Sequence, residues 1–383
     1  MDVNNVAWCA QEEQRLLAFP RALVRPDGDA VVLDFDGSDT GRSAPTYLTG
    51  RTAHVAALAG YRGSPTAARD AHRLRLRLIE QGPHGWTDDP PVGEAPWSLY
   101  ALSFVILAAA TGTGSGSPEA STLLQLALNR LENDFWDTDR GLPVDRVRRD
   151  GSQTDYRGLN GAMHLTEALF AAWAATGDDR YRDRAIGMCR FVIDSARSRA
   201  WRICEHYDDR WNPQPDFNRD APDHAFLPFG STPGHGFEWA RLIAQSTDLP
   251  GTEGFHDAAE ALYRRAVVDG WHRLGSGGFV YTVDWSGSPC STRELHWVAA
   301  EALAAASVLE RVLGTASSVA GDADRWLDHI RNRFVDERHG SWTQEIGRAP
   351  APKPDLYHAV QAMLIPQLPV APSLLAAVQE RRG

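Results

Sequence analysis

The chain has 383 residues, of which 43% are hydrophobic and 23% are charged, values typical of a folded protein with a sizeable core. Its formal net charge of −11 argues against nucleic acid or an anionic membrane as a partner, because both attract basic surfaces. The four cysteines form no C-x-x-C pair, the N-terminus lacks the basic start of a signal peptide, and no apolar run approaches the ~20 residues of a membrane span. We therefore expect a soluble cytoplasmic protein whose ligand is small and neutral or weakly charged.

Helical periodicity dominates the sequence, in two kinds of segment that alternate along the chain. One kind has an apolar stripe and a charged face, which is typical of a helix with one side in water. These segments are residues 6–19, 66–81, 120–136, 180–196, 255–271 and 320–335. The other kind is small or apolar nearly all round, which predicts helices buried on most sides. Those segments are residues 52–61, 98–110, 161–175, 234–246, 295–309 and 357–368.

Six buried helices that alternate with six half-exposed helices predict an all-α protein, an (α/α)6 barrel of two concentric rings. The buried helices carry recurring landmarks, one for each helix hairpin: Arg51, Trp97, His164, His235, Trp297 and His358. A straight solenoid of six hairpins is the alternative, but it would expose its end units, and neither end has the polar face of a cap. Because no long linker interrupts the chain, we expect one domain that spans residues 1–383.

Five turn-rich segments connect each outer helix to the next inner helix. They are residues 84–97, 140–153, 201–222, 277–289 and 340–350. Glycine and proline punctuate them, and several have the pattern of short β-hairpins. Because all five join elements in the same sense, we expect them to gather at one mouth of the barrel, where functional residues tend to lie.

Three inner helices are predicted to begin with a histidine that is followed three residues later by a carboxylate or amide on the same face. The pairs are His164 with Glu167, His235 with Glu238 and His358 with Gln361. A lone buried histidine is typically a core residue, but three at repeat-equivalent positions indicate a function. A helix N-terminus opposes protonation of histidine, which leaves a neutral imidazole that can act as a general base near neutral pH.

Two chemistries can use this histidine cluster. Histidine and glutamate three residues apart on facing helices resemble carboxylate-bridged metal sites, but such sites usually supply more carboxylates than the matching positions offer here. The alternative is proton transfer without a metal, in which two histidines flank a substrate carbon and Arg51 neutralises an enediolate oxygen. Taken alone, Arg51 would be interpreted as a surface or capping residue.

Four motifs make the chain similar to the N-acylglucosamine 2-epimerase family: GLNGAMHLTEAL, PFGSTPGHGFEWARLI, LHWVAAEALAAA and KPDLYHAVQAMLIPQLP. The resemblance covers nearly the whole chain and is greatest to the branch that interconverts D-mannose and D-fructose. It implies the same (α/α)6 barrel, a monosaccharide substrate and no metal or nucleotide cofactor in the chemical step. The expected reaction is an aldose–ketose isomerisation through a cis-enediol.

The resemblance also implies roles for single residues. His235 and His358 match the two catalytic histidines, with His358 acting on carbon and His235 in ring opening and in proton transfer between the oxygens, although the two can be exchanged. Glu238 is expected to orient His235, and Arg51 matches the arginine at the reacting end of the sugar. Sugar binding and the aromatic lining are assigned to Asn160, His164, Glu238, Tyr100 and Trp297.

Two departures from the family pattern bear on the substrate. Leu102 stands where the family often has a histidine, and Leu227 stands where many relatives have an arginine. Both positions bear on how remote hydroxyls or a substituent are held, so the sequence defines the reaction type better than the sugar. The alternatives within the family are a sugar 2-epimerase and a sulfoquinovose-type isomerase.

Two alternatives lie outside the family. An (α/α)6 glycoside hydrolase needs two carboxylates that face each other across a bond, and residues 135–141 (FWDTDRG) and 334–340 (FVDERHG) supply candidate acids. Both segments follow an outer helix at equivalent positions, which favours a shared structural turn. A non-catalytic sugar-binding protein would not need three equivalent histidines. The 13 tryptophans suit a sugar ligand because pyranose faces pack on aromatic rings, although most single tryptophans are expected to be packing residues.

Overall fold

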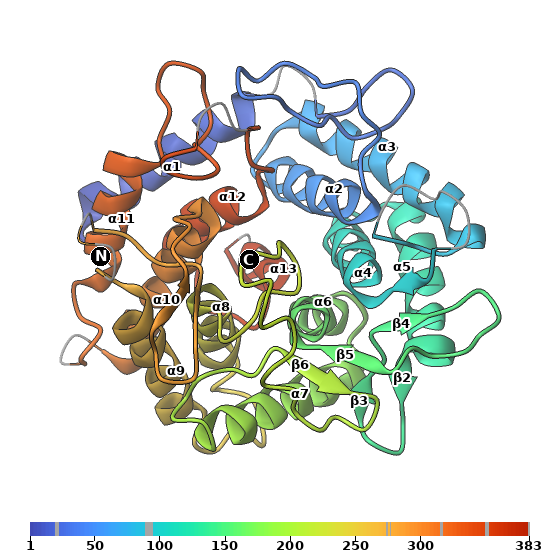
Figure 1. The fold of residues 1–383 in the computed structure, drawn as a ribbon. Helices are drawn as coiled ribbons and strands as arrows, with labels where there is room; N and C mark the ends of the chain where they lie inside the picture. The colour runs from blue at the N-terminus through green and yellow to red at the C-terminus, as the bar shows by residue number, and fades with distance from the viewer. Residues whose placement is uncertain are drawn as a thin grey trace.

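The computed structural model describes residues 1–19, 23–88, 95–272, 275, 277–314, 317–348 and 352–381. These residues form two concentric rings of helices (Figure 1). The inner ring consists of α2 (Thr46–Tyr61), α4 (Leu99–Thr113), α6 (Leu159–Thr176), α8 (Pro233–Gln245), α10 (His296–Leu313) and α12 (Tyr357–Leu364). The outer ring consists of α1 (Val3–Ala18), α3 (Pro65–Gln81), α5 (Pro118–Arg130), α7 (Asp179–Arg197), α9 (Phe255–Gly270) and α11 (Asp322–Arg333).

The inner ring is closed. Each inner helix packs against the next inner helix along the chain, and the last, α12, packs against the first, α2. The outer helix α1 packs against α12, and every other outer helix packs against the inner helix that precedes it. A straight solenoid would keep its first and last helices apart. The predicted all-α (α/α)6 barrel is therefore confirmed.

The burial pattern explains which helix lies in which ring. In α4, every residue from Ala101 to Gly112 is buried, as expected for a helix surrounded by other helices. In α3, the buried side chains are Ala67, Asp70, Ala71, Leu74, Arg75 and Leu78, whose spacing of three to four residues marks one face. The apolar segments thus enclose the core, and the amphipathic segments cover it.

One helix boundary and one additional helix differ from the prediction at the C-terminal end. The segment 357–368 was expected as one helix, but α12 ends at Leu364 and a 3₁₀ turn, η3 (Ile365–Gln367), follows. Pro366 explains the change, because proline lacks the N–H that a continuing helix needs. A further helix that the periodicity did not predict, α13 (Leu374–Glu380), packs against α2 and α6 at the centre of the ring (Figure 1).

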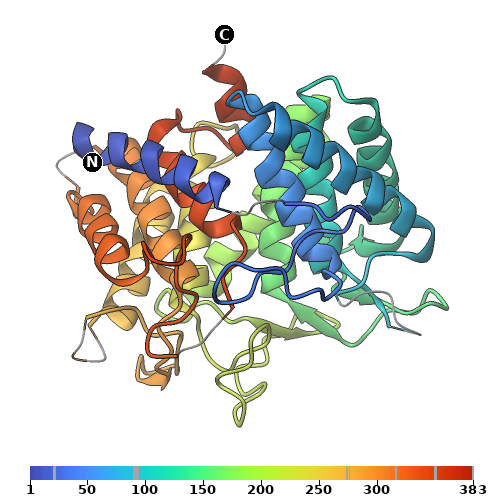
Figure 2. The same cartoon turned by 90° about the horizontal axis from the view of Figure 1, so that it is seen from above.

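Short strands lie at the end of the barrel opposite α13 (Figure 2). Two antiparallel pairs are local hairpins, as predicted: β2 (Trp136–Asp137) with β3 (Leu142–Pro143), and β7 (Thr282–Val283) with β8 (Pro289–Ser291). Two other pairs join distant segments: β1 (Trp97–Ser98) with β4 (Arg146–Val147), and β5 (Tyr156–Gly158) with β6 (His206–Asp208). These two pairs are not the hairpins that the turn pattern predicts.

The distant strand pairs belong to a ring of contacts between successive loops. The backbone N–H groups of Leu99, Leu159 and His296, at the starts of α4, α6 and α10, donate to carbonyls of the next loop along the chain. The acceptors are Asp145, Glu205 and Gln344. The starts of these three inner helices are thereby fixed to the loop that precedes the next inner helix.

Two helical turns complete the connections: η1 (Gly82–His84) follows α3, and the five-residue η2 (Leu131–Phe135) extends α5. Part of the predicted mouth segments, residues 89–94 and 349–350, lies outside the described residues. No helix among the described residues is long and apolar enough to cross a membrane. Cys9, Cys189, Cys204 and Cys290 are all unpaired.

Candidate active site

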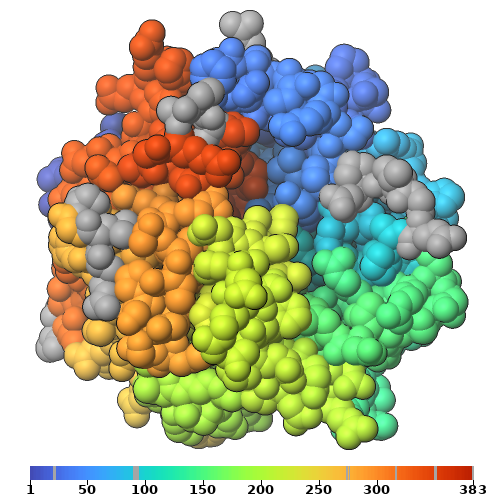
Figure 3. Space-filling view, in the orientation of Figure 1, coloured from blue at the N-terminus to red at the C-terminus, as the bar shows by residue number. Residues whose placement is uncertain are grey.

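A cavity of about 310 Å³ opens at the mouth of the barrel. Its lining includes all eight residues proposed from the sequence: Arg51, Tyr100, Asn160, His164, His235, Glu238, Trp297 and His358. The long loop between β6 and α8 lies across the middle of this face in the space-filling view (Figure 3). The structure thus brings the proposed site residues together around one cavity under the mouth loops.

Only some of the predicted mouth segments reach the cavity. Tyr281 and Gln344 come from segments 277–289 and 340–350, whereas no residue of segments 84–97 or 140–153 that the structure describes lines it. Phe226, just beyond segment 201–222, packs edge-on against Tyr100 with ring centroids 5.7 Å apart.

The chain before α2 forms a further wall that the sequence did not indicate. Val32 and Leu33 of this N-terminal segment line the cavity. The N-terminal segment therefore gives the cavity an apolar side.

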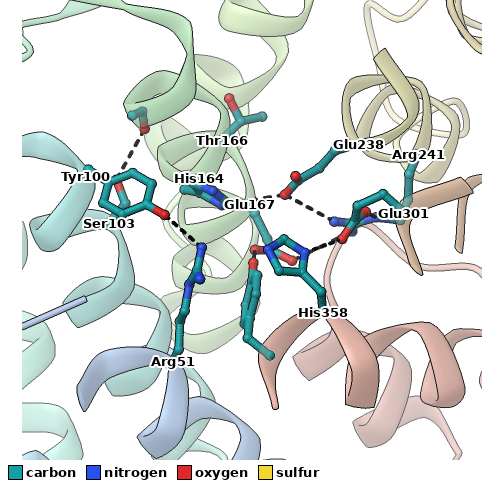
Figure 4. Close-up of polar contacts among 12 residues, drawn as sticks. Arg51, Tyr100, Ser103, His164, Thr166, Glu167, Glu238, Arg241, Glu301 and His358 are labelled. Carbon is teal, nitrogen blue, oxygen red and sulfur yellow. Dashed lines mark hydrogen bonds and ion pairs between the residues drawn. The ribbon is translucent and has the colours of Figure 1, made fainter. Parts of the chain in front are cut away.

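His358 forms a dyad with a glutamate on the neighbouring inner helix. Its Nδ1 atom lies 2.8 Å from Oε1 of Glu301, and the other oxygen of Glu301 accepts from Nε of Arg241 at 3.1 Å (Figure 4). Burial alone would raise the pKa of Glu301, but Arg241 and then His358 lower that pKa to about 2. An ionised Glu301 favours the tautomer with a proton on Nδ1 of His358, which leaves Nε2 as the basic nitrogen.

His235 forms a second dyad, with a loop residue. Its Nδ1 atom lies 3.0 Å from Oε2 of Glu205, a buried side chain just before β6. The expectation that Glu238 orients His235 is wrong, because the Glu238 carboxyl group points toward His164 and Arg241 (Figure 4). Residues three apart share a helix face, but Glu238 lies nearly one helical turn further along α8 than His235. It therefore contacts a different set of side chains.

The indole of Trp297 lies between the two dyads. Its ring centroid is 5.3 Å from that of His235 and 5.8 Å from that of His358. Gly234 makes this placement possible, since a Cβ atom there would meet the Trp297 ring at 2.3 Å. The two imidazoles thus flank one aromatic floor, on which a sugar face can pack.

Arg51 is buried and held in a fixed direction. Its Nη1 atom donates to Asp355 at 2.9 Å and its Nη2 atom donates to the hydroxyl oxygen of Tyr100 at 2.8 Å. The guanidinium also stacks over the rings of Phe104 and Tyr357, at 4.5 and 4.8 Å from their centroids. This preorganised cation suits a developing negative charge on a substrate oxygen, and its burial excludes the surface interpretation of Arg51.

Below the cavity, Arg241 contacts three buried glutamates. Its guanidinium nitrogens lie 3.1 Å from Glu301, 3.6 Å from Glu167 and 3.6 Å from Glu238. Glu301 has the additional contact with His358, and Glu167 accepts a hydrogen bond from the Tyr357 hydroxyl. One guanidinium therefore serves three carboxyl groups, and two of these have further hydrogen-bonding partners.

Glu238 is the carboxyl group without such support. Neither of its oxygens has a hydrogen-bond partner in the described part of the chain, although the side chain is only 1% exposed. Burial, and then the nearby Glu301, raise the pKa of Glu238 well above its usual range. Its neighbour His164, 3.5 Å away, has a pKa well below the usual range because of burial and then Arg51. The environment of each side chain therefore favours its neutral form.

More carboxyl groups lie close to the histidines than the sequence suggested. Two sets of side chains bring ligand atoms within 4.8 Å of one another: His164 with Glu167 and Glu238, and Glu238 with Glu301 and His358. The expectation of too few carboxylates for a metal is therefore wrong. In the structure the positive charge among these groups comes from Arg241, which contacts all three glutamates.

The histidines do not all sit at helix starts. His235 and His358 lie in the first turns of α8 and α12, whereas His164 is in the second turn of α6. The prediction of three equivalent first-turn histidines is thus wrong for His164, and burial is the first cause of the lowered pKa of that residue. Asn160 occupies the first turn of α6, where its Nδ2 atom lies 3.5 Å from the carbonyl of Phe226.

The two candidate hydrolase acids form matching turns. Asp137 accepts from the backbone N–H groups of residues 139 and 140, and Asp336 accepts from those of residues 338 and 339. Neither acid lines the cavity. The interpretation of both segments as a shared structural turn fits this geometry.

Five site residues were missed by the sequence analysis: Glu205, Glu301, Arg241, Asp355 and Tyr357. Glu301 and Arg241 carry a usable signal, since they lie one helical turn below Trp297 and Glu238 on the same faces. Asp355 lies outside any helix, and Glu205 lies in a loop whose path depends on the β5–β6 pairing. No periodicity marks those two positions.

The fold and the site define a class of protein: an (α/α)6 barrel with two carboxylate-bound histidines and a buried arginine around one cavity at its mouth. The N-acylglucosamine 2-epimerase (GlcNAc 2-epimerase) family matches residues 31–362. The chain belongs to this family.

Relatives and a solved structure agree with this assignment. The chain is 37% identical to a D-mannose isomerase of Thermobifida fusca, with 97% of this chain and 96% of the relative covered. It is 35% identical to a D-mannose isomerase of Pseudomonas cannabina pv. alisalensis, with 97% and 94% covered. A crystal structure of D-mannose isomerase has the same fold, with a TM-score of 0.88 at 24% identity over 94% of this chain and 97% of that one.

Proposed function

We propose that this protein is an aldose–ketose isomerase that interconverts D-mannose and D-fructose by histidine general acid/base catalysis. Two D-mannose isomerases that are 37% and 35% identical to nearly the whole chain support the reaction class. The single observation that carries the chemistry is the pair of dyads, His358–Glu301 and His235–Glu205, on either side of Trp297.

The geometry supports a defined order of proton transfers. His235 moves the proton of the anomeric hydroxyl to the ring oxygen, which opens the ring to an aldehyde. Nε2 of His358 takes the proton from carbon 2; the electron pair forms the carbon 1–carbon 2 double bond, and the carbonyl oxygen becomes an anion that faces Arg51. His235 moves the proton of oxygen 2 to oxygen 1, and His358 returns its proton to carbon 1. The product is the ketose, and both histidines end as they began.

The charges around the cavity favour a neutral sugar. Each lysine or arginine that the structure places in its lining is already paired with a carboxylate: Arg51 with Asp355, Arg293 with Glu345 and Lys353 with Asp336. An anionic substituent such as a sulfonate would need to displace one of these carboxylates. Mannose therefore fits better than sulfoquinovose as the substrate.

Two family activities are separated by one assay. The purified protein is supplied with mannose, lyxose, glucose, cellobiose or sulfoquinovose, and the early products are identified. We expect fructose from mannose as the fastest reaction. If mannose gives mainly glucose, or if cellobiose reacts faster than mannose, the protein is an epimerase. Turnover of none of the five sugars by the folded protein would contradict an isomerase and favour a binding protein.

A variant pair tests the histidine chemistry. His358→Ala should lower turnover at least ~10²-fold, the usual scale of a lost general base, whereas His256→Ala, on the exposed face of α9, should not. Retention of more than about a tenth of wild-type turnover by His358→Ala would remove this residue from the mechanism.

Heavy water provides an independent measurement of the same step. Early fructose formed in heavy water should carry less than one solvent deuteron at carbon 1, because a single shielded base returns part of the original proton. Full incorporation from the first turnover would contradict a shielded single base.

The proposal also includes independence of metals. Arg241 supplies the positive charge among Glu167, Glu238 and Glu301, where a cation would otherwise be held. Treatment with a chelator should leave turnover unchanged. Loss of turnover that added manganese or cobalt restores would contradict the proposed metal independence.

We further propose a cytoplasmic location, which suits four unpaired cysteines.

A further inference from the structure

The chain contains a single lysine. All other basic side chains among its 39 Lys and Arg residues are arginines. This lysine, Lys353, lies in the lining of the cavity with its side chain only 3% exposed. A buried ammonium is costly unless it is paired, and the Nζ atom of Lys353 donates to Oδ2 of Asp336 at 2.6 Å. The position of the ion pair therefore needs an explanation.

Lys353 connects three segments of the mouth. Its side chain reaches the turn after α11 through Asp336, and its backbone N–H donates to the carbonyl of Asp34 in the N-terminal segment at 3.4 Å. Lys353 also lies two residues before Asp355, which binds Arg51, and five before His358. The irregular stretch before α12, which leads to Asp355 and His358, is thus held near its beginning by the side chain of Lys353.

The internal repeat offers a comparison. Asp137 forms the same turn after α5 and accepts from the equivalent backbone N–H groups, but its ion pair is with the exposed Arg140 three residues away. Only the copy of the turn next to the cavity reaches across to another segment. A local turn needs no such contact, so the Lys353–Asp336 pair serves something other than the turn.

We propose that Lys353 is a positioning residue, whose ion pair with Asp336 holds residues 352–356 so that Asp355 aligns Arg51 and the adjacent wall of Val32 and Leu33 closes on the sugar. The side chain acts through Arg51 and the wall, not by transferring a proton. The inference rests on the proposed function only in the choice of mannose as the test sugar.

Steady-state kinetics with a matched control test the proposal. Lys353→Met removes the charge and keeps most of the length, Asp336→Asn removes the partner charge, and Asp137→Asn is the control in the equivalent turn. We expect the first two variants to raise KM roughly tenfold or more, because a misplaced wall weakens sugar positioning, and to lower kcat as well, because Arg51 faces the developing anion. The control should keep the wild-type KM.

Two further variants separate positioning from folding. Lys353→Arg keeps a cation that can reach Asp336 and should restore most of the KM. The double variant Lys353→Met/Asp336→Asn should be no worse than the poorer single variant, because the two residues act as one unit. A merely structural pair would lower the melting temperature and the active fraction but leave the KM of the folded protein unchanged. That result in all variants would overturn the proposal.

The single lysine also gives a direct spectroscopic readout. Protein labelled with [¹⁵N]lysine should show one backbone amide signal, that of Lys353. We expect this signal to shift when mannose is added to wild type or Asp137→Asn, and to shift less in Asp336→Asn. An unmoved signal under saturating sugar would contradict the proposal. If the wild type binds a different sugar, the function proposed above fails, and the same titration with that sugar still tests Lys353.

Discussion

Glu301 lies on the inner helix before that of His358, and its Oε1 atom is 2.8 Å from Nδ1 of the imidazole. The carboxylate and the imidazole therefore come from adjacent inner helices, and the distance between them depends on the packing of α10 against α12. The other dyad is built differently, since Glu205 comes from a loop and not from a helix. The two histidines are thus oriented by independent parts of the fold, and their roles can be tested separately.

Replacing Glu301 should impair the carbon chemistry. Glu301→Gln keeps the shape but removes the charge that orients His358, so kcat for mannose should fall roughly 10²-fold. Because proton abstraction then limits turnover, the kinetic isotope effect with mannose deuterated at carbon 2 should rise. An isotope effect that falls below the wild-type value would assign Glu301 to another step.

Replacing Glu205 should impair ring opening instead. Glu205→Gln leaves the His358–Glu301 dyad intact, so kcat should fall while the isotope effect at carbon 2 moves toward unity, because ring opening then limits the rate. The opposite pattern in the two glutamine variants would mean that His235 acts on carbon and His358 on oxygen.

Glu238 should destabilise the fold as the pH rises. Its pKa is raised in the folded protein by burial and then Glu301, whereas its ordinary value is 4.5. Above about pH 4.5 the unfolded chain releases a proton that the folded protein keeps, so the folded state loses relative stability as pH increases. Glu238→Gln, which has no such proton, should be more stable than wild type near neutral pH by an amount that shrinks in acid. Chemical unfolding at several pH values measures this difference, and a constant difference would contradict it.

His54 should have the opposite effect in acid. It is buried on α2 with Nδ1 2.8 Å from the Thr111 hydroxyl, and burial lowers its pKa to about 3. The unfolded chain binds a proton at about 6.5. The contribution of His54 to stability is therefore complete above about pH 6.5 and is lost as the pH falls toward 3.

A variant of His54 measures that contribution. The free energy of unfolding of His54→Asn should fall less steeply between about pH 6.5 and 4 than that of wild type, by up to about 1.4 kcal/mol per pH unit. His256→Asn, in which the histidine is exposed in both states, should keep the wild-type slope. Equal slopes for all three proteins would remove His54 from the acid response.

The two rings could be predicted from the sequence because a helix with one buried face has a periodic pattern of apolar residues, whereas a helix buried on all sides is apolar throughout. The contrast between segments 98–110 and 66–81 is enough to assign α4 to the inner ring and α3 to the outer ring. It could not predict α13, whose seven residues are too few for a clear period.

The site was predictable only where residues share a helical face. His235 and His358 lie in the first turns of their inner helices, Arg51 lies in the second turn of α2, and Glu301 follows Trp297 by one turn. Glu205 depends on strand pairing between loops that are distant in sequence, which no local pattern records. The prediction of a partner for His235 failed for the same reason. Helical spacing indicated Glu238, whereas the residue in contact with His235 is Glu205, which lies in a loop.

Helix α13 lies across the end of the inner ring that is opposite the mouth loops (Figure 2). It packs on α2 and α6 at the centre of the ring, at the end away from the mouth loops (Figures 1 and 2). The cavity that holds the site opens at the mouth, so an arriving aldose and a departing ketose use the same side of the barrel. Bound fructose blocks the binding of mannose. Accumulated product should therefore compete with substrate for the free protein and slow the forward reaction well before equilibrium is reached.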